Sequence, residues 1–122
     1  MKKAIIVLLF ISAAAKAQTT TPDSAKYFAG SLKTVCGNVS GTHRAKSGMI
    51  FINFEKPYPD NEFTAVIRAK DTSAFKDGNP AVYLKDKYVC VIGKIKMYKG
   101  KPELIIKSPA QIRFPDSLKT DY

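Results

Sequence analysis

Residues 88–112 read YVCVIGKIKMYKGKPELIIKSPAQI, and this stretch decides the fold. In its first half, every second side chain from Val89 to Met97 is apolar or small, which is the period of a β-strand with one buried face. Lys99-Gly100 is a tight-turn signal, and the apolar run in residues 102–107 predicts a second strand. Ser108-Pro109 ends that strand. The stretch therefore predicts a β-hairpin that closes the domain.

Three more strands and a helical insert are predicted upstream of the hairpin. The strands are a long segment from Lys33 that is bent at its glycines, then residues 48–54 and residues 62–68. Asp71 is a candidate N-cap for one or two helical turns, which the Asp-Gly-Asn-Pro sequence at 77–80 would stop. Five strands with a helix between the third and the fourth make an all-β OB-fold, a partly open Greek-key barrel. A small unrelated β-sandwich is the alternative.

Several motifs in this order resemble a family of small bacterial OB-fold domains that is usually described as nucleic-acid-binding-like. They are VCGNV in the first strand, GMIFINF in the second, a Tyr-Pro loop, FTAVI in the third, and the hairpin with its SPAQI ending. The likeness covers residues 35–112. It implies the OB barrel and, less specifically, a nucleic-acid ligand, because one fold hosts many functions.

The first residues, MKKAIIVLLFISAAAKAQ, have the layout of a secretory signal peptide. Their apolar run is shorter than the roughly 20 residues that a membrane span needs, so cleavage after Ala17 and a periplasmic or secreted protein are expected. The predicted organisation is signal peptide 1–17, N-terminal leader 18–32, OB-fold domain 33–114 and C-terminal tail 115–122. The whole chain has a formal charge of +10. The excess of cations favours polyanionic partners, although a solvated lysine surface is the plain alternative.

Cys36 and Cys90 are the two cysteines of the chain. Strand alternation places Val35 and Val39 in the core and Cys36 outside, and it buries the face of the fourth strand that carries Val89 and Met97, leaving Cys90 outside. In an OB barrel these two strands are antiparallel neighbours. An exported chain can keep a disulfide there, and two free thiols are the alternative.

No residue pattern in the sequence predicts a catalytic or metal site. His43 is the single histidine, and no phosphate-binding glycine loop or paired-histidine motif is present. The acidic residues are scattered rather than clustered for a metal. We therefore expect a protein that is not an enzyme and has no cofactor and no metal.

A binding module is the remaining interpretation. OB barrels bind across their second and third strands, between the loop after the first strand and the last hairpin. Cations there would contact phosphates and aromatic rings would stack on bases, as single-stranded nucleic acid of low sequence specificity requires. The same groove or a strand edge would serve an envelope protein or an acidic glycan in the alternative function, and the face on which Phe51 lies is open. The candidate residues are Arg44, Lys46, Phe51, Asn53, Arg68, Tyr98, Lys99 and Lys101.

Overall fold

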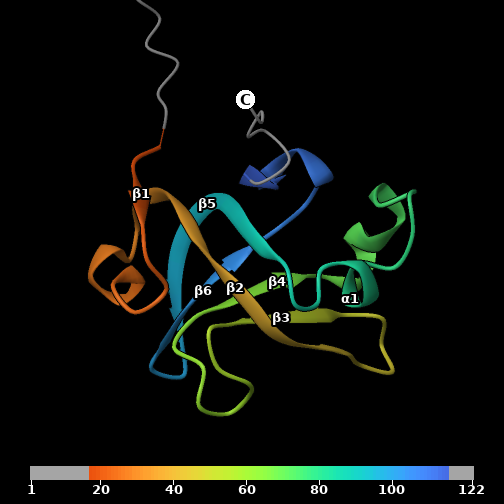
Figure 1. The fold of residues 1–122 in the computed structure, drawn as a ribbon, viewed down its shortest axis with the longest axis horizontal. Coiled ribbons are helices and arrows are strands. Elements are labelled where there is room, and N and C mark those ends of the chain that lie inside the picture. The colour runs from red at the N-terminus through yellow and green to blue at the C-terminus, as the bar shows by residue number, and fades with distance from the viewer. Residues whose placement is uncertain (1–16, 116–122) are drawn as a thin grey trace, which may run out of the picture.

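The structure is a computed structural model that describes residues 17–115. The predicted signal peptide, apart from Ala17, and the predicted tail, apart from Pro115, lie outside the described residues. Short 3₁₀ turns accompany the strands and one α-helix (Figure 1). The elements are β1 (Thr19–Thr20), η1 (Ala25–Phe28), β2 (Leu32–Arg44), β3 (Ile50–Phe54), β4 (Thr64–Ile67), η2 (Ala69–Ala74), α1 (Pro80–Tyr83), β5 (Tyr88–Tyr98), β6 (Lys101–Ile105), η3 (Pro109–Gln111) and β7 (Ile112–Arg113).

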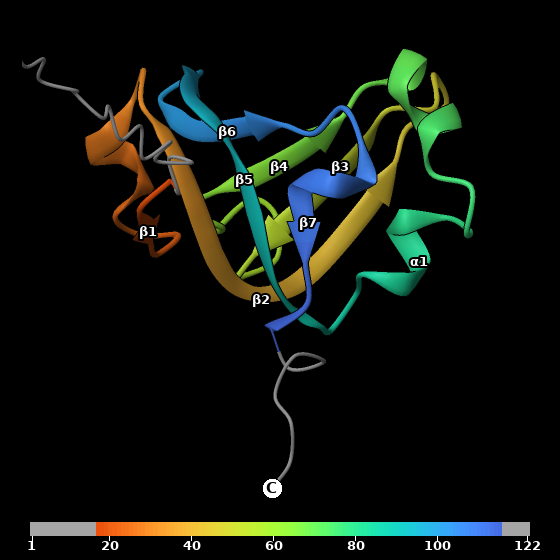
Figure 2. The ribbon, with the colours of Figure 1, turned by 90° about the horizontal axis from the view of Figure 1, so that it is seen from above.

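Five of the strands close into the predicted all-β OB barrel. They follow one another in the order β2-β3-β4-β6-β5, and β5 pairs back onto β2. All neighbours are antiparallel except β4 and β6, which are parallel. Closure is achieved by β2, which curves around the whole barrel and pairs with β5 through one half and with β3 through the other (Figure 2).

The bend in β2 has two local causes. Gly37 has no side chain, so Pro22 and Glu55 can pack closely against β2. A Cβ at this position would lie 2.7 Å from Pro22 Cγ and 2.6 Å from Glu55 Oε2. The pairing with β3 also shifts by one residue between Val39 and Gly41. Such a β-bulge bends a strand and exchanges the faces on which its following side chains lie.

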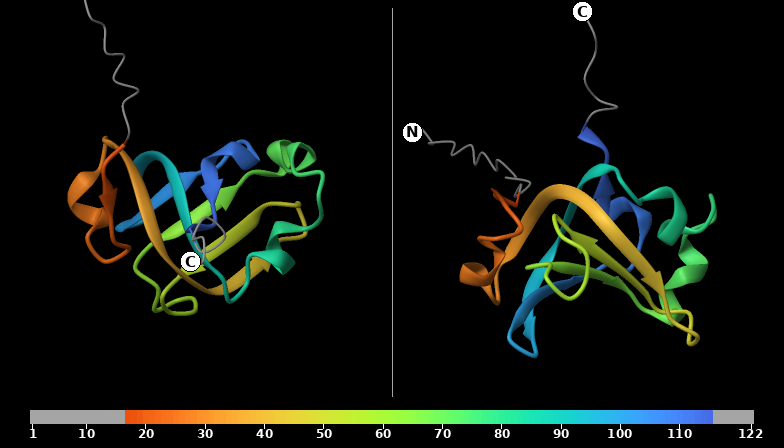
Figure 3. Two further views of the ribbon diagram at one scale, coloured as in Figure 1. Left: turned by 45° about the horizontal axis from the view of Figure 1, so that its top comes forward. Right: turned by 60° about the horizontal axis from the view of Figure 1, so that its bottom comes forward.

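The barrel encloses a core to which every strand of the closed sheet contributes. Val35, Ile52, Phe54, Ile95 and Leu104 are fully buried members of this core. Phe54 packs on Phe63 with ring centroids 5.2 Å apart. The turn η1 lies at one end of the barrel, and the turn η2 and the helix α1 lie at the other end (Figure 3). Within residues 17–115, no helix has the length and apolar character needed to cross a bilayer.

The cysteine prediction is confirmed. Cys36 and Cys90 are direct cross-strand partners in the β2–β5 pairing and form a disulfide. It joins positions 54 residues apart in the sequence. The parity of both strands is also as expected, since Val35 and Val89 are fully buried. Met97 departs from this pattern and is 43% exposed, because β5 extends beyond the end of the core there.

The segments outside the barrel differ from the expectations in detail. The predicted helical insert is a 3₁₀ turn, η2, and the sequence expected to stop it instead begins α1, because Asn79 Oδ1 accepts a hydrogen bond from Ala81 N at 3.0 Å. The leader is partly ordered into the fold, since β1 pairs with β2 in parallel. The last barrel strand is Lys101–Ile105 rather than residues 102–107, because η3 draws the chain away.

Candidate nucleic-acid interface

An apolar row crosses the outer face of the barrel. His43, Phe51 and Val66 are consecutive partners on β2, β3 and β4, and Val66 pairs in turn with Ile105 on β6. Each residue lies on the opposite side of its strand from a core residue such as Ile52 or Leu104. Val66 is 3% exposed but stands outside the core cluster.

Phe51 is the aromatic platform of this row. Its ring is half-buried, and the exposed ring of His43 stacks against it at a centroid distance of 6.1 Å and an interplanar angle of 22°. The side chain of Phe51 therefore faces outward, which decides the question that the sequence leaves open. An exposed aromatic edge beside a stacked imidazole is a surface on which a planar ligand group can stack.

A polar row runs beside the apolar one, two residues later on β3 and two residues earlier on β4 and β6. It consists of Asn53, Thr64 and Glu103, which are consecutive partners on β3, β4 and β6, and of Lys96 on β5 opposite Glu103. Asn53 is 5% exposed, and its Oδ1 accepts from Asn61 Nδ2 and from Thr64 Oγ1, each at 3.2 Å. The Asn53 amide thus belongs to a buried network and is not the freely exposed contact that the sequence suggested.

Glu103 is a carboxylate in the middle of this face. Its side chain is 15% exposed, and its Oε1 lies 4.0 Å from Lys96 Nζ. Burial raises the pKa of Glu103, and the nearby Lys96 ammonium opposes that rise. A half-desolvated acceptor therefore faces outward in a region that is otherwise cationic.

Lys101 has a structural task on this face. Its Nζ donates to the backbone carbonyls of Pro59 and of Asn61, the latter at 3.0 Å. These contacts hold the loop between β3 and β4 against β6. The ammonium lies at the edge of the polar row, but two of its donor directions are already used. The neighbouring Tyr98 and Lys99 are exposed at the hairpin tip, where Lys99 Nζ lies 5.3 Å from the Tyr98 ring centroid.

Two cations border the apolar row on the side away from the polar row. Arg68 follows β4 two residues after Val66, and its Nε donates to Asp71 Oδ2 at 3.0 Å. Lys107 is exposed two residues after Ile105, and its backbone N donates to Gln111 Oε1 at 2.7 Å. Arg68 was expected at the site, whereas Lys107 was missed because the sequence placed it inside the last strand.

The loop after β2 is only partly placed as predicted. Arg44 pairs with Ile50, so its side chain leaves β2 on the face opposite to Phe51, and at this end of the barrel it is exposed. His43, which is not among the candidate residues, takes the outward position beside Phe51 instead. The bulge between Val39 and Gly41 causes this exchange, and simple alternation along β2 does not reveal it. Lys46 is exposed in the loop between β2 and β3.

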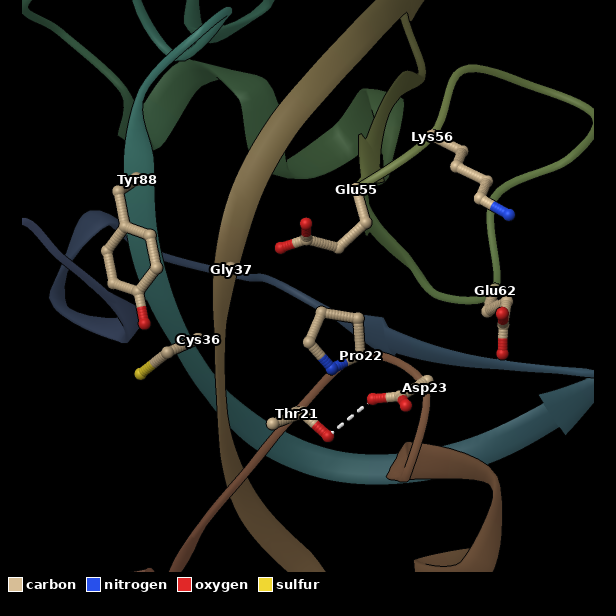
Figure 4. A pocket seen from close by; sticks show the side chains of 9 residues that line it. All are labelled: Thr21, Pro22, Asp23, Cys36, Gly37, Glu55, Lys56, Glu62 and Tyr88. Atoms are coloured by element: carbon tan, nitrogen blue, oxygen red, sulfur yellow. Dashed lines mark hydrogen bonds between the residues drawn. The ribbon is translucent and has the colours of Figure 1, made fainter.

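A separate hollow of about 410 Å³ lies where the leader meets the loop between β3 and β4, with Gly37 at its floor (Figure 4). Asp23, Glu55 and Glu62 line it together with one lysine, Lys56. The Glu55 carboxylate accepts from Asn38 N at 2.8 Å and so serves the backbone of β2. Three carboxylates against one ammonium give this hollow the wrong charge for a polyanion, so the outer sheet face is the better candidate interface.

Comparison with known proteins gives a likeness in fold and assigns no function. No family model matches the chain, and no curated protein matches it. A putative aspartyl-tRNA synthetase from Leishmania major Friedlin is similar in backbone, with a TM-score of 0.50 and 10% identity over 84% of this chain and 22% of its own. This chain therefore spans less than a quarter of that protein.

Two further solved structures have lower scores. The Stn1–Ten1 complex of S. pombe is 22% identical over 63% of this chain and 54% of its own, with a TM-score of 0.47. The hypothetical protein ygiW from E. coli is 18% identical over 80% of this chain and 89% of its own, with a TM-score of 0.46. Neither of these two likenesses carries an argument, and the closed five-stranded OB barrel is established by the strand pairing of this chain itself.

Proposed function

We propose that this protein is an exported, non-enzymatic OB-fold module that binds single-stranded nucleic acid across β3, β4 and β6. The observation that carries the proposal is the outward apolar row of His43, Phe51, Val66 and Ile105, which has cations along its border. Export rests on the signal-peptide pattern of the sequence and is part of the proposal.

The apolar row suits the bases of a single strand. Every base has a flat face, and stacking on an aromatic side chain stabilises binding by about 1–3 kcal/mol per base. Phe51 offers such a ring, and the stacked His43 lengthens the platform toward β2. Double-stranded nucleic acid keeps its bases stacked on one another, so a platform of this kind favours unpaired strands.

The bordering cations suit the phosphates. Arg68 and Lys107 each follow a member of the apolar row by two residues, just beyond the ends of the parallel strands β4 and β6. Asp71 fixes the Arg68 guanidinium through one nitrogen, which leaves the remaining donors of the fork available. Each phosphate that is neutralised releases counterions, so binding should weaken as salt rises.

Fluorescence anisotropy with labelled oligo-dT over a salt series tests the proposal, using the chain from Gln18 to Tyr122. We expect Phe51→Ala to weaken binding about tenfold or more, since one stacked base is lost. Arg68→Ala with Lys107→Ala should flatten the slope of log K against log salt by about 1.4.

Matched controls separate specific contacts from overall charge. Lys26→Ala with Lys85→Ala removes the same two charges from η1 and from the turn after α1, and it should leave the slope almost unchanged. A labelled acidic polysaccharide provides the second ligand. If oligo-dT does not bind at low salt, or if both double variants flatten the slope equally, the proposal is refuted. Retention of an envelope protein or of the polysaccharide instead would then favour the alternative function.

A further inference from the structure

His43 is the member of the apolar row that can carry a charge. It is exposed on β2, and its ring lies nearly parallel to the Phe51 ring, with the two centroids 6.1 Å apart. The two residues are direct cross-strand partners, so the pairing of β2 with β3 fixes their placement. Imidazole is the side chain that ordinarily gains or loses a proton between about pH 5 and 8. The platform on which a base would stack therefore includes a group whose charge depends on pH.

The elements that pack beside this end of β2 bring few other titratable groups. The strands β3 and β4 and the helix α1 contain no charged residue, and Tyr83 on α1 titrates only in alkali because burial raises its pKa. Arginine, lysine and aspartate side chains ordinarily keep one charge between about pH 5.5 and 8. The charged residues that immediately adjoin these elements are Arg44, Lys46, Arg68 with its partner Asp71, Lys85 and Asp86.

Glu103 is a second titratable group on the outer face, on β6, two strands away from Phe51. Burial raises the pKa of Glu103, and Lys96 opposes that rise. Protonation of this carboxylate in acid would remove a negative charge from the face. It would therefore act on a polyanion in the same direction as protonation of His43, and an experiment has to separate the two groups.

From the stacking of a titratable ring on the aromatic platform, we propose that protonation of His43 strengthens the binding of single-stranded nucleic acid, so that the interface is activated by acid. This inference rests on the proposed function and names the regulation of the same site. An imidazolium attracts phosphate, and a cation over an aromatic face is favourable. The phosphates of a bound strand in turn favour the charged form of a neighbouring base. Binding and protonation therefore strengthen each other by the same factor.

This reciprocity fixes the size of the effect in two ways that must agree. One hydrogen bond with a charged donor corresponds to about tenfold in affinity. Tenfold tighter binding in acid requires the titration midpoint of the imidazole to rise by about one pH unit in the complex. The tightening is complete below the midpoint of the free protein and is lost as the pH rises through the midpoint of the complex. One more cation at the site also steepens the slope of log K against log salt by about 0.7.

Fluorescence anisotropy with labelled oligo-dT tests the inference on the chain from Gln18 to Tyr122, at about pH 5.5 and pH 8 and at constant ionic strength. Thymine does not change its charge in this range. We expect the native protein to bind about tenfold more tightly in acid, with the steeper salt slope. His43→Gln keeps a planar polar side chain without the charge, and it should bind equally at both pH values. His43→Lys should lose the pH dependence and keep the steeper slope in alkali.

Proton NMR provides a second measurement that needs no variant, because His43 is the single histidine of the chain. Its ring C–H resonance is titrated with and without oligo-dT, and the midpoint should rise by about one pH unit on binding. Two matched controls should keep the pH dependence. Glu103→Gln removes the second titratable group of the face, and Lys26→Gln removes one cation from η1, at the other end of the barrel from α1 (Figure 3). Thermal unfolding at both pH values shows that the variants are folded.

The outcomes distinguish this inference from the function on which it rests. Equal affinity of the native protein at the two pH values, a pH dependence that survives His43→Gln, or an unchanged midpoint would overturn the role of His43 and leave the nucleic-acid proposal standing. A pH dependence that disappears in Glu103→Gln would assign the effect to that carboxylate and would also overturn the role of His43. Absence of oligo-dT binding at both pH values would overturn both proposals.

Discussion

Removal of the Cys36–Cys90 disulfide should lower the free energy of unfolding by about 4 kcal/mol. The bond closes a loop of 54 residues, and the chain-entropy relation for a loop of this size gives about 14 cal/mol/K, which is about 4 kcal/mol at 25 °C. The gain arises mainly in the unfolded chain, whose freedom the bond restricts. Domains of this size are stable by only about 5–15 kcal/mol, so the loss would be a large share of the total.

Urea unfolding of the chain from Gln18 to Tyr122 measures this loss. The oxidised protein is compared with the Cys36→Ala/Cys90→Ala variant, and each is measured with and without reductant. With a urea slope of about 1–3 kcal/mol/M, a loss of 4 kcal/mol moves the midpoint by at least about 1.3 M. Reductant should destabilise the native protein and leave the variant unchanged. Coincident midpoints for oxidised and reduced protein would refute the entropic argument.

Three substitutions test the surrounding packing. Gly37→Ala should destabilise the fold by about 1–3 kcal/mol in urea unfolding, because the new methyl group meets Pro22 and Glu55 at less than 3 Å; an unchanged midpoint would mean that the leader does not pack there. Gln111→Glu should cost about 3 kcal/mol, since Nε2 donates to the carbonyls of Ile92 and Ile105 and a carboxylate oxygen would repel both; equal stability would contradict this. Glu103→Gln should melt at a higher temperature than the native protein at neutral pH, because burial raises the pKa of Glu103 and disfavours its ionised form in the folded state. That gap should close as the pH falls through the pKa of the folded protein, and a gap that widens in acid would refute the assignment.

The barrel was predictable from sequence because its signals are local. Alternating side chains along residues 88–98, the Lys99-Gly100 turn and the bend at Gly37 each indicate structure within a few residues. Parity and the neighbouring positions of two strands in the OB barrel placed the two cysteines opposite each other, while the choice between a disulfide and two free thiols stayed open in the sequence. Each of these inferences needs only the period of a strand and the order of the strands.

The interface was harder to predict because its geometry depends on contacts between distant segments. A one-residue bulge in β2 places His43 on the face of Phe51 and the exposed Arg44 on the opposite face, and alternation alone assigns these faces the other way round. Asn53 became buried because Asn61, in a loop eight residues away, covers it. The sequence predicts a free cation at Lys101, but its ammonium donates to carbonyls about forty residues away in the sequence.

The attachment of the two chain ends gives the barrel a particular mechanical design. Near the amino end, β1 pairs with Thr34 and Val35 on β2, directly before Cys36. Near the carboxyl end, β7 pairs with β5 at Cys90 and at the residue after it. A force applied between the two ends first acts on these two short strand pairings. Once they have separated, the force acts on the Cys36–Cys90 disulfide. The strands β3 and β4 lie inside the loop that the disulfide closes, so tension between the ends bypasses them, whereas β6 lies between Cys90 and β7 and carries the load. A tethered copy of the protein would therefore keep the β3–β4 part of its outer face in shape under tension.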